Sequence, residues 1–245
     1  MKNCKHIYFI FFIFIFGFSI LKAQTAEKLL KNMDDLMTAP KDKQATVKII
    51  LTDKTGKEKI REASLKQKGK YKKLYRYTKP EKHAGIATLS LPDNKLWLYM
   101  PAFKKPIKIS LLSKSQAFTG TDFSYEDMSG NSYSERYTPK MANSNNPEIY
   151  LLELTPKSNK SKYSKILLYL DKTHFYPVKM EYFNKSSKYS KVATYKYAKH
   201  GKYWYAEEVL MTDIKKNHST GIIMTDIKFD QGIADEEFLV ENLKQ

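Results

Sequence analysis

The chain has 245 residues and a formal net charge of +17, with 43 lysine and arginine residues against 26 acidic ones. Only three of the basic residues are arginine, whereas base and phosphate recognition in nucleic-acid-binding proteins relies on the bidentate guanidinium group. We therefore interpret the charge as a solvated, lysine-rich surface and expect no nucleic-acid partner. The single cysteine, Cys4, precedes a long apolar run, which excludes disulfide bonds and thiolate metal sites from the rest of the chain.

The N-terminus has the pattern of a secretory signal. Lys2 and Lys5 precede an apolar block of about 14 residues, which is short for a membrane span of roughly 20. Ala23 suits cleavage before Gln24. We expect residues 1–23 to be a signal peptide that is removed, and residues 24–245 to form one domain. An uncleaved N-terminal anchor is the alternative.

The mature chain begins with one helical pattern and continues with strands. Leu29, Leu30, Met33, Leu36 and Met37 recur at spacings of three and four, which predicts an amphipathic helix ending before a proline. Roughly ten runs with strand character follow at short intervals, separated by turn residues. Several of these runs are apolar on both faces, so both faces of the sheet must be covered. The sequence therefore predicts a mainly β (α+β) fold with a wide antiparallel sheet.

A central segment, residues 99–128, interrupts this strand pattern. It contains apolar, basic and acidic blocks in turn, and Gly120 permits a sharp turn. Asp122 or Ser124 can cap a short helix that carries Phe123, Tyr125 and Met128. Because one N-terminal helix cannot cover a wide sheet, we expect this segment to be a lid over its concave, apolar face.

Catalytic motifs are weak in this sequence. There is no G-x-S-x-G motif, no phosphate-binding glycine loop and no histidine pair at metal-ligand spacing. The carboxylates of Asp122, Glu126 and Asp127 could in principle serve glycoside chemistry, but acidic residues at a helix start ordinarily complement the helix dipole. We therefore expect no enzyme activity, no cofactor and no metal.

The central segment also carries a resemblance. The pattern F-x-G-x-D-F-x-x-E-D, here from Phe118 to Asp127, lies within a helix, meander and closing-helix arrangement that resembles the outer membrane lipoprotein-sorting proteins, relatives of the LolA-type periplasmic carriers. The resemblance implies an incomplete β-barrel, closed by helices, whose apolar cavity holds acyl chains. For such a cavity we expect these residues to form the lid and bind lipid: Trp97, Met100, Ile107, Ile109, Phe118, Phe123, Tyr125 and Met128.

The sequence departs from the resemblance at one basic pair. Lys104 and Lys105 stand where many relatives have arginine, which keeps the charge but loses the bidentate fork. We expect these lysines to contact a headgroup or a partner. Aromatic residues make up 13% of the chain, and ordinary sheet packing would account for most of them, so the cavity is favoured for the set rather than for any single residue.

The resemblance implies a monomeric periplasmic carrier of lipoprotein acyl chains or lipid. An inner-membrane transporter would load it and an outer-membrane acceptor would receive the cargo. Two alternatives stay open: a lipid-sensing regulatory module that acts through a protein partner, and a structural envelope protein whose core is filled. The regulatory module would form a stable complex with a membrane protein's periplasmic domain and show no transfer activity, whereas the structural protein would contain no bound lipid.

Overall fold

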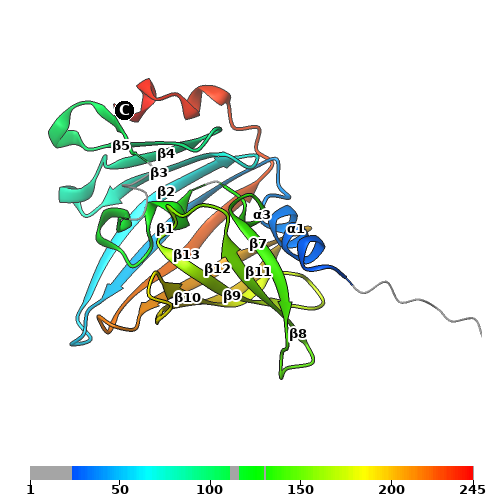
Figure 1. Ribbon diagram of the computed structural model, residues 1–245. Coiled ribbons are helices and arrows are strands. Elements are labelled where there is room, and N and C mark those ends of the chain that lie inside the picture. The colour runs from blue at the N-terminus through cyan, green and yellow to red at the C-terminus, as the bar shows by residue number, and fades with distance from the viewer. Residues whose placement is uncertain (1–23, 111–115, 130, 245) are drawn as a thin grey trace, which may run out of the picture.

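The protein folds around one strongly curved antiparallel sheet. The computed structural model describes residues 24–110, 116–129 and 131–244. Its 13 strands follow the order β6-β5-β4-β3-β2-β1-β13-β12-β11-β10-β9-β8-β7, so both halves of the chain form meanders that meet where β1 pairs with β13. Figure 1 shows this curvature. The mainly β fold expected from the sequence is confirmed, whereas the expected signal peptide lies outside the described residues.

The first half of the sheet contains β1 (Asp42–Thr52), β2 (Glu58–Lys68), β3 (Lys72–Lys79), β4 (Ala87–Leu91), β5 (Lys95–Tyr99) and β6 (Pro106–Lys108). The second half contains β7 (Tyr137–Ala142), β8 (Ile149–Pro156), β9 (Tyr163–Asp171), β10 (Pro177–Asn184), β11 (Tyr189–His200), β12 (Tyr203–Asp213) and β13 (His218–Phe229). In the described ranges the two edge strands, β6 and β7, form no hydrogen-bonded pair, so the barrel is open between them. The chain between Lys108 and Tyr137 connects these two edges.

Helix α1 (Ala26–Met37) forms as its apolar spacing predicts. Thr25 caps its first turn, and Leu29, Leu30 and Met33 are fully buried against the sheet. The buried carboxylate of Asp34 accepts backbone hydrogen bonds of 2.9 and 2.8 Å from Tyr133 and Ser134, and so joins α1 to the short helix α3 (Tyr133–Arg136). Figure 1 shows α1 beside α3 and β7. The helix therefore covers only one end of the concave face.

The C-terminal segment covers part of the opposite face. Its two 3₁₀ turns, η5 (Asp235–Phe238) and η6 (Glu241–Lys244), place Phe238 and Leu243 in a second apolar cluster with Leu74 and Leu89. Because alternate side chains of a strand point to opposite faces, Leu74 faces this cluster while its neighbour Tyr75 faces the main core. Figure 1 shows the segment beside β4 and β5.

Two polar side chains, Asp42 and Arg76, fix the C-terminal segment in place. The Asp42 carboxylate accepts backbone hydrogen bonds of 2.8 to 3.1 Å from residues 231–233, and the Arg76 guanidinium donates to the carbonyls of Asn242 and Leu243.

Every helix in the described ranges is too short or too polar to cross a membrane.

Candidate functional site

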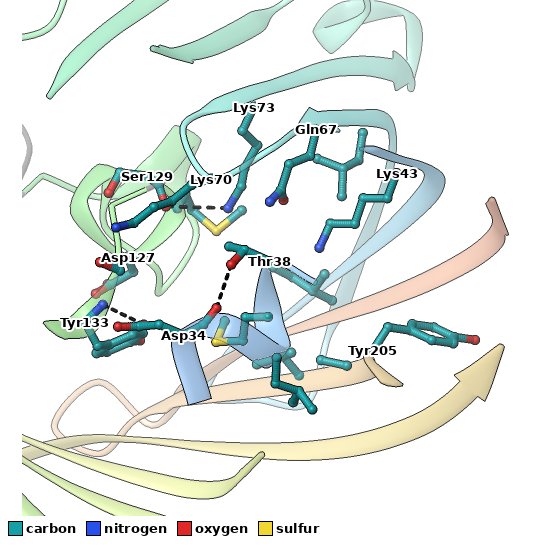
Figure 2. A pocket seen from close by; sticks show the side chains of 18 of the residues that line it. Asp34, Thr38, Lys43, Gln67, Lys70, Lys73, Asp127, Ser129, Tyr133 and Tyr205 are labelled. Atoms are coloured by element: carbon teal, nitrogen blue, oxygen red, sulfur yellow. Dashed lines mark hydrogen bonds between the residues drawn. The ribbon is translucent and has the colours of Figure 1, made fainter. Parts of the chain in front are cut away.

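A cavity lies on the concave face of the sheet, between α1, the strands and residues 116–129, which we call the lid segment. Its volume is about 180 Å³, far more than the 10–15 Å³ or so that one water molecule requires. Much of its wall is apolar or aromatic, contributed by Leu36 and Met37 of α1, by Phe123 and Met128 of the lid segment, and by Leu65, Tyr75, Tyr182, Tyr195, Tyr197, Trp204, Val209, Ile222 and Met224 of the sheet. Figure 2 shows side chains that line it, among them Asp34, Lys43 and Lys73.

The lid segment is anchored at Asp122. This carboxylate is only 4% exposed, and it accepts a 2.7 Å hydrogen bond from the Thr220 hydroxyl and lies 2.7 Å from Nδ1 of His218. The backbone N–H of Asp122 donates to Thr220, and the Lys191 ammonium donates to the Asp122 carbonyl. Strands β11 and β13 therefore hold the lid segment at one point through four polar contacts.

The short helix of the lid segment, α2 (Tyr125–Met128), is capped by Ser124. The Ser124 hydroxyl accepts from the backbone of Asp127, whose carboxylate in turn accepts from the Ser124 backbone, which completes a capping box. Of the two caps that the sequence allowed, Asp122 is therefore the wrong one, because its side chain turns toward β13 instead. Gly120 has a φ of 77° in the preceding turn.

Aromatic contacts hold the rest of the lid segment against β2 and β3. The Phe118 ring packs edge-on against Tyr75 and Tyr125, at centroid distances of 5.9 and 5.4 Å. The Arg61 guanidinium donates a 2.6 Å hydrogen bond to the Thr119 carbonyl, and the Tyr77 and Thr119 hydroxyls are hydrogen-bonded. The lid segment is thus packed on the sheet at both ends.

The residues predicted to bind lipid fall into three groups. Phe123 and Met128 line the cavity, while Ile109, Phe118 and Tyr125 are buried in the main core around it. Met100 and the 41% exposed Ile107 do not contribute to the lining, and neither do the exposed Lys104 and Lys105.

Trp97 requires a correction. Its side chain packs with the cluster under η5 and η6, on the face of the sheet opposite the cavity. The alternation along β5 explains this position, because Leu96 and Leu98 on either side of Trp97 face the main core.

Sequence reasoning missed the tyrosines that form the cavity wall. Tyr182, Tyr195 and Tyr197 come from β10 and β11, far along the chain from the lid segment. Burial raises the pKa of each phenol, and the hydroxyls of Tyr182 and Tyr195 both donate to the sulfur of Met180. The alternate positions of Tyr195 and Tyr197 in the sequence indicate that these two side chains share one face of the sheet, but they do not tell which face is concave.

Cations also lie at the cavity. Burial lowers the pKa of Lys43 to about 8, and burial together with the nearby charges of Lys43 and Arg136 lowers the pKa of Lys73 to about 7. Both lysines keep some accessible surface, and Figure 2 shows their ammonium groups turned toward the cavity.

Lys70 and Arg136 are the other cations of the lining. The Arg136 guanidinium lies 3.5 Å from the Glu126 carboxylate and 4.6 Å from the ring centroid of Tyr133, so its charge is compensated within the protein. Across the residues described, no three histidine, cysteine or acidic side chains come together in a way that could hold a metal ion.

The fold and the cavity define a class of protein: an open antiparallel β-barrel whose concave face is covered by an N-terminal helix and a lid. Such a structure from Vibrio parahaemolyticus, an outer membrane lipoprotein-sorting protein domain, is 30% identical to this chain and superposes with a TM-score of 0.81, covering 90% of this chain and 100% of that one. By this likeness the chain belongs to the outer membrane lipoprotein-sorting protein family.

Two further structures share the fold. A DUF1329 family protein from Desulfovibrio piger is 22% identical with a TM-score of 0.81, over 89% of this chain and 97% of that one. A LolA superfamily protein from Nitrosomonas europaea is 23% identical with a TM-score of 0.74, over 89% and 98%. The model of a family described as uncharacterized proteins matches residues 69–245. Among curated proteins, no sequence matches this chain significantly.

Proposed function

We propose that this protein is a periplasmic carrier that binds acyl chains of lipids or lipoproteins in the cavity and carries them toward the outer membrane. The single observation that supports this most is the cavity itself, which the side chains of α1, the lid segment and the sheet leave unfilled although they are largely apolar. Each chain methylene that enters an apolar cavity leaves water with a gain of about 0.8 kcal/mol. Binding then needs neither a cofactor nor a covalent step.

The lid segment gives this proposal a route for entry and release. It forms part of the connection between β6 and β7, the edge strands of the barrel, and Phe123 and Met128 face the cavity from its inner side. Release would follow contact with a partner that displaces the lid segment or offers the chain a better site. An inner-membrane transporter and an outer-membrane acceptor are the partners that the family relationship suggests. The exposed Lys104 and Lys105 are our candidates for such a contact.

Met128→Asp tests the cavity assignment. A carboxylate on the inner side of the lid segment would have to be desolvated by a bound chain, so we expect the affinity for a fluorescent long-chain fatty acid to fall by at least about tenfold. The readout is fluorescence titration of the mature protein. Met128 is only half-buried, so the fold should survive.

The matched control is Met141→Asp on β7. Met141 is 42% exposed and lies outside the cavity lining, so this variant should bind as the parent does. Equal affinities of the two variants would contradict the assignment of the cavity as the lipid site.

A further inference from the structure

Two lysines flank a glutamine in one row across the sheet. Lys43 of β1 lies opposite Gln67 of β2, and Gln67 lies opposite Lys73 of β3. Residues directly opposite each other on neighbouring strands point to the same face, and all three side chains line the cavity. Adjacent strands are about 4.8 Å apart, so the two lysines begin about 10 Å from each other and their side chains can approach one anion from both sides. Figure 2 shows the three side chains together.

Both acidic side chains of the cavity lining are engaged elsewhere. Asp34 accepts the backbone N–H groups at the start of α3, and Asp127 accepts from Ser124 and from the Tyr163 hydroxyl. These two carboxylates therefore serve to hold α1, α3 and the lid segment in place.

The other cations of the lining have carboxylate partners, unlike Lys43 and Lys73. Lys70 forms an ion pair with Glu135 at 2.6 Å, and Arg136 lies against Glu126. In the part of the chain that the structure describes, no carboxylate lies within 4.0 Å of the Lys43 or Lys73 ammonium, and the Lys73 ammonium donates a 3.5 Å hydrogen bond to the Ser129 carbonyl.

Two uncompensated cations beside an apolar cavity are unfavourable in the empty protein. Burying a charge without a counter-charge is disfavoured, and the two ammonium groups also repel each other. Burial lowers the pKa of both lysines, and the charges of Lys43 and Arg136 lower that of Lys73 further. An anion placed between them would restore the missing counter-charge and accept several hydrogen bonds at once.

We propose that the cavity binds an amphiphile whose anionic head, a carboxylate or a phosphate, lies between Lys43, Gln67 and Lys73 while its chain extends along the tyrosine-lined wall. This inference rests on the proposed function and narrows its cargo. The acylated glyceryl group of a lipoprotein is uncharged, so a site of this kind selects an anionic lipid over the lipid moiety of a lipoprotein.

The test compares three ligands that share one acyl or alkyl chain length and differ in the head, together with a free anion that has no chain. The mature protein from Gln24 onward, freed of lipid, is titrated by calorimetry at neutral pH with hexadecanoate, hexadecyl phosphate, hexadecanol and inorganic phosphate. We expect the two anionic amphiphiles to bind at least about tenfold more tightly than hexadecanol, the factor that one charge-assisted contact supplies. The stronger of the two identifies the head as carboxylate or phosphate.

The decisive variant is Lys43→Met with Lys73→Met, which keeps the apolar stems and removes both charges. We expect its preference for the anionic heads to fall to within about twofold while hexadecanol binding persists. The control is Lys48→Met with Lys79→Met, which removes the same charge from the same two strands at exposed positions outside the lining. This control should keep the parent's preference.

The outcomes separate this inference from the proposed function. If the parent binds hexadecanol as tightly as the anionic amphiphiles, or if the double variant keeps the preference, the headgroup site is wrong and lipid binding stands. Binding of inorganic phosphate without any amphiphile would show a site for a free anion and would also overturn the inference. If none of the amphiphiles binds, the proposed function fails as well.

Discussion

Replacing Asp122 with alanine is expected to lower the free energy of unfolding by about 3 kcal/mol and to release the lid segment from β13. The carboxylate is buried, and its removal would leave the Thr220 hydroxyl, which is fully buried, and the His218 ring without their shared acceptor. Chemical denaturation measures the stability. Amide hydrogen exchange across residues 116–129 measures the release, which we expect as faster exchange.

Asp35→Ala provides the control for this prediction. Its carboxylate is 62% exposed and pairs with Lys31 on the surface of α1, so we expect a change below about 1 kcal/mol. Asp122→Asn, which keeps the shape and one acceptor oxygen, should fall between the two. Unchanged exchange in the lid segment of Asp122→Ala would show that the aromatic contacts of Phe118 suffice to hold it.

Replacing Lys73 with methionine is expected to stabilise the lipid-free protein by about 2 kcal/mol at neutral pH. The substitution keeps the apolar stem within the cavity wall and removes a cation that is desolvated and repelled by Lys43 and Arg136. A gain in stability at the cost of ligand affinity is typical of residues retained for function. Thermal and chemical denaturation of delipidated protein measure the effect, and a destabilised variant would mean that Lys73 has a counter-charge after all.

The same lysine predicts a pH dependence. Its pKa in the folded protein, about 7, is below the ordinary value of 10.5, so the unfolded chain binds more protons between these two values. The free energy of unfolding of the parent should therefore rise as the pH increases above about 7. Burial also lowers the pKa of Lys43 and Lys191 to about 8, so part of the rise should persist in Lys73→Met. A slope that is equal in parent and variant would contradict the assignment.

The sequence predicted the elements of the fold better than their spatial relations. The helical spacing from Leu29 to Met37 and the alternating strand patterns are local signals, and the structure confirms the helix and the antiparallel sheet. The turn at Gly69, which divides β2 from β3, is a local feature of the same kind. Local periodicity is enough for such features because each residue's face depends on its near neighbours.

The site was harder to predict, because its wall combines strands from both halves of the chain. Trp97 and Phe123 look equally suitable from sequence, yet one faces the C-terminal turns and the other the cavity. The basic pair predicted to contact a headgroup or partner, Lys104 and Lys105, is exposed. Lys43 and Lys73, by contrast, are separated by 30 positions in the sequence and come together only through the pairing of β1, β2 and β3. Registers between distant strands are not visible in one sequence.

The most direct test of the central claim is native mass spectrometry of the mature protein, purified gently from a periplasmic extract, followed by organic extraction of whatever is bound. The account predicts a stoichiometric acylated species that is lost on extraction and restored by adding it back. If the headgroup site is correct, that species carries a carboxylate or phosphate. A protein that is free of lipid as isolated, and that takes up no added long-chain amphiphile, would contradict the carrier function.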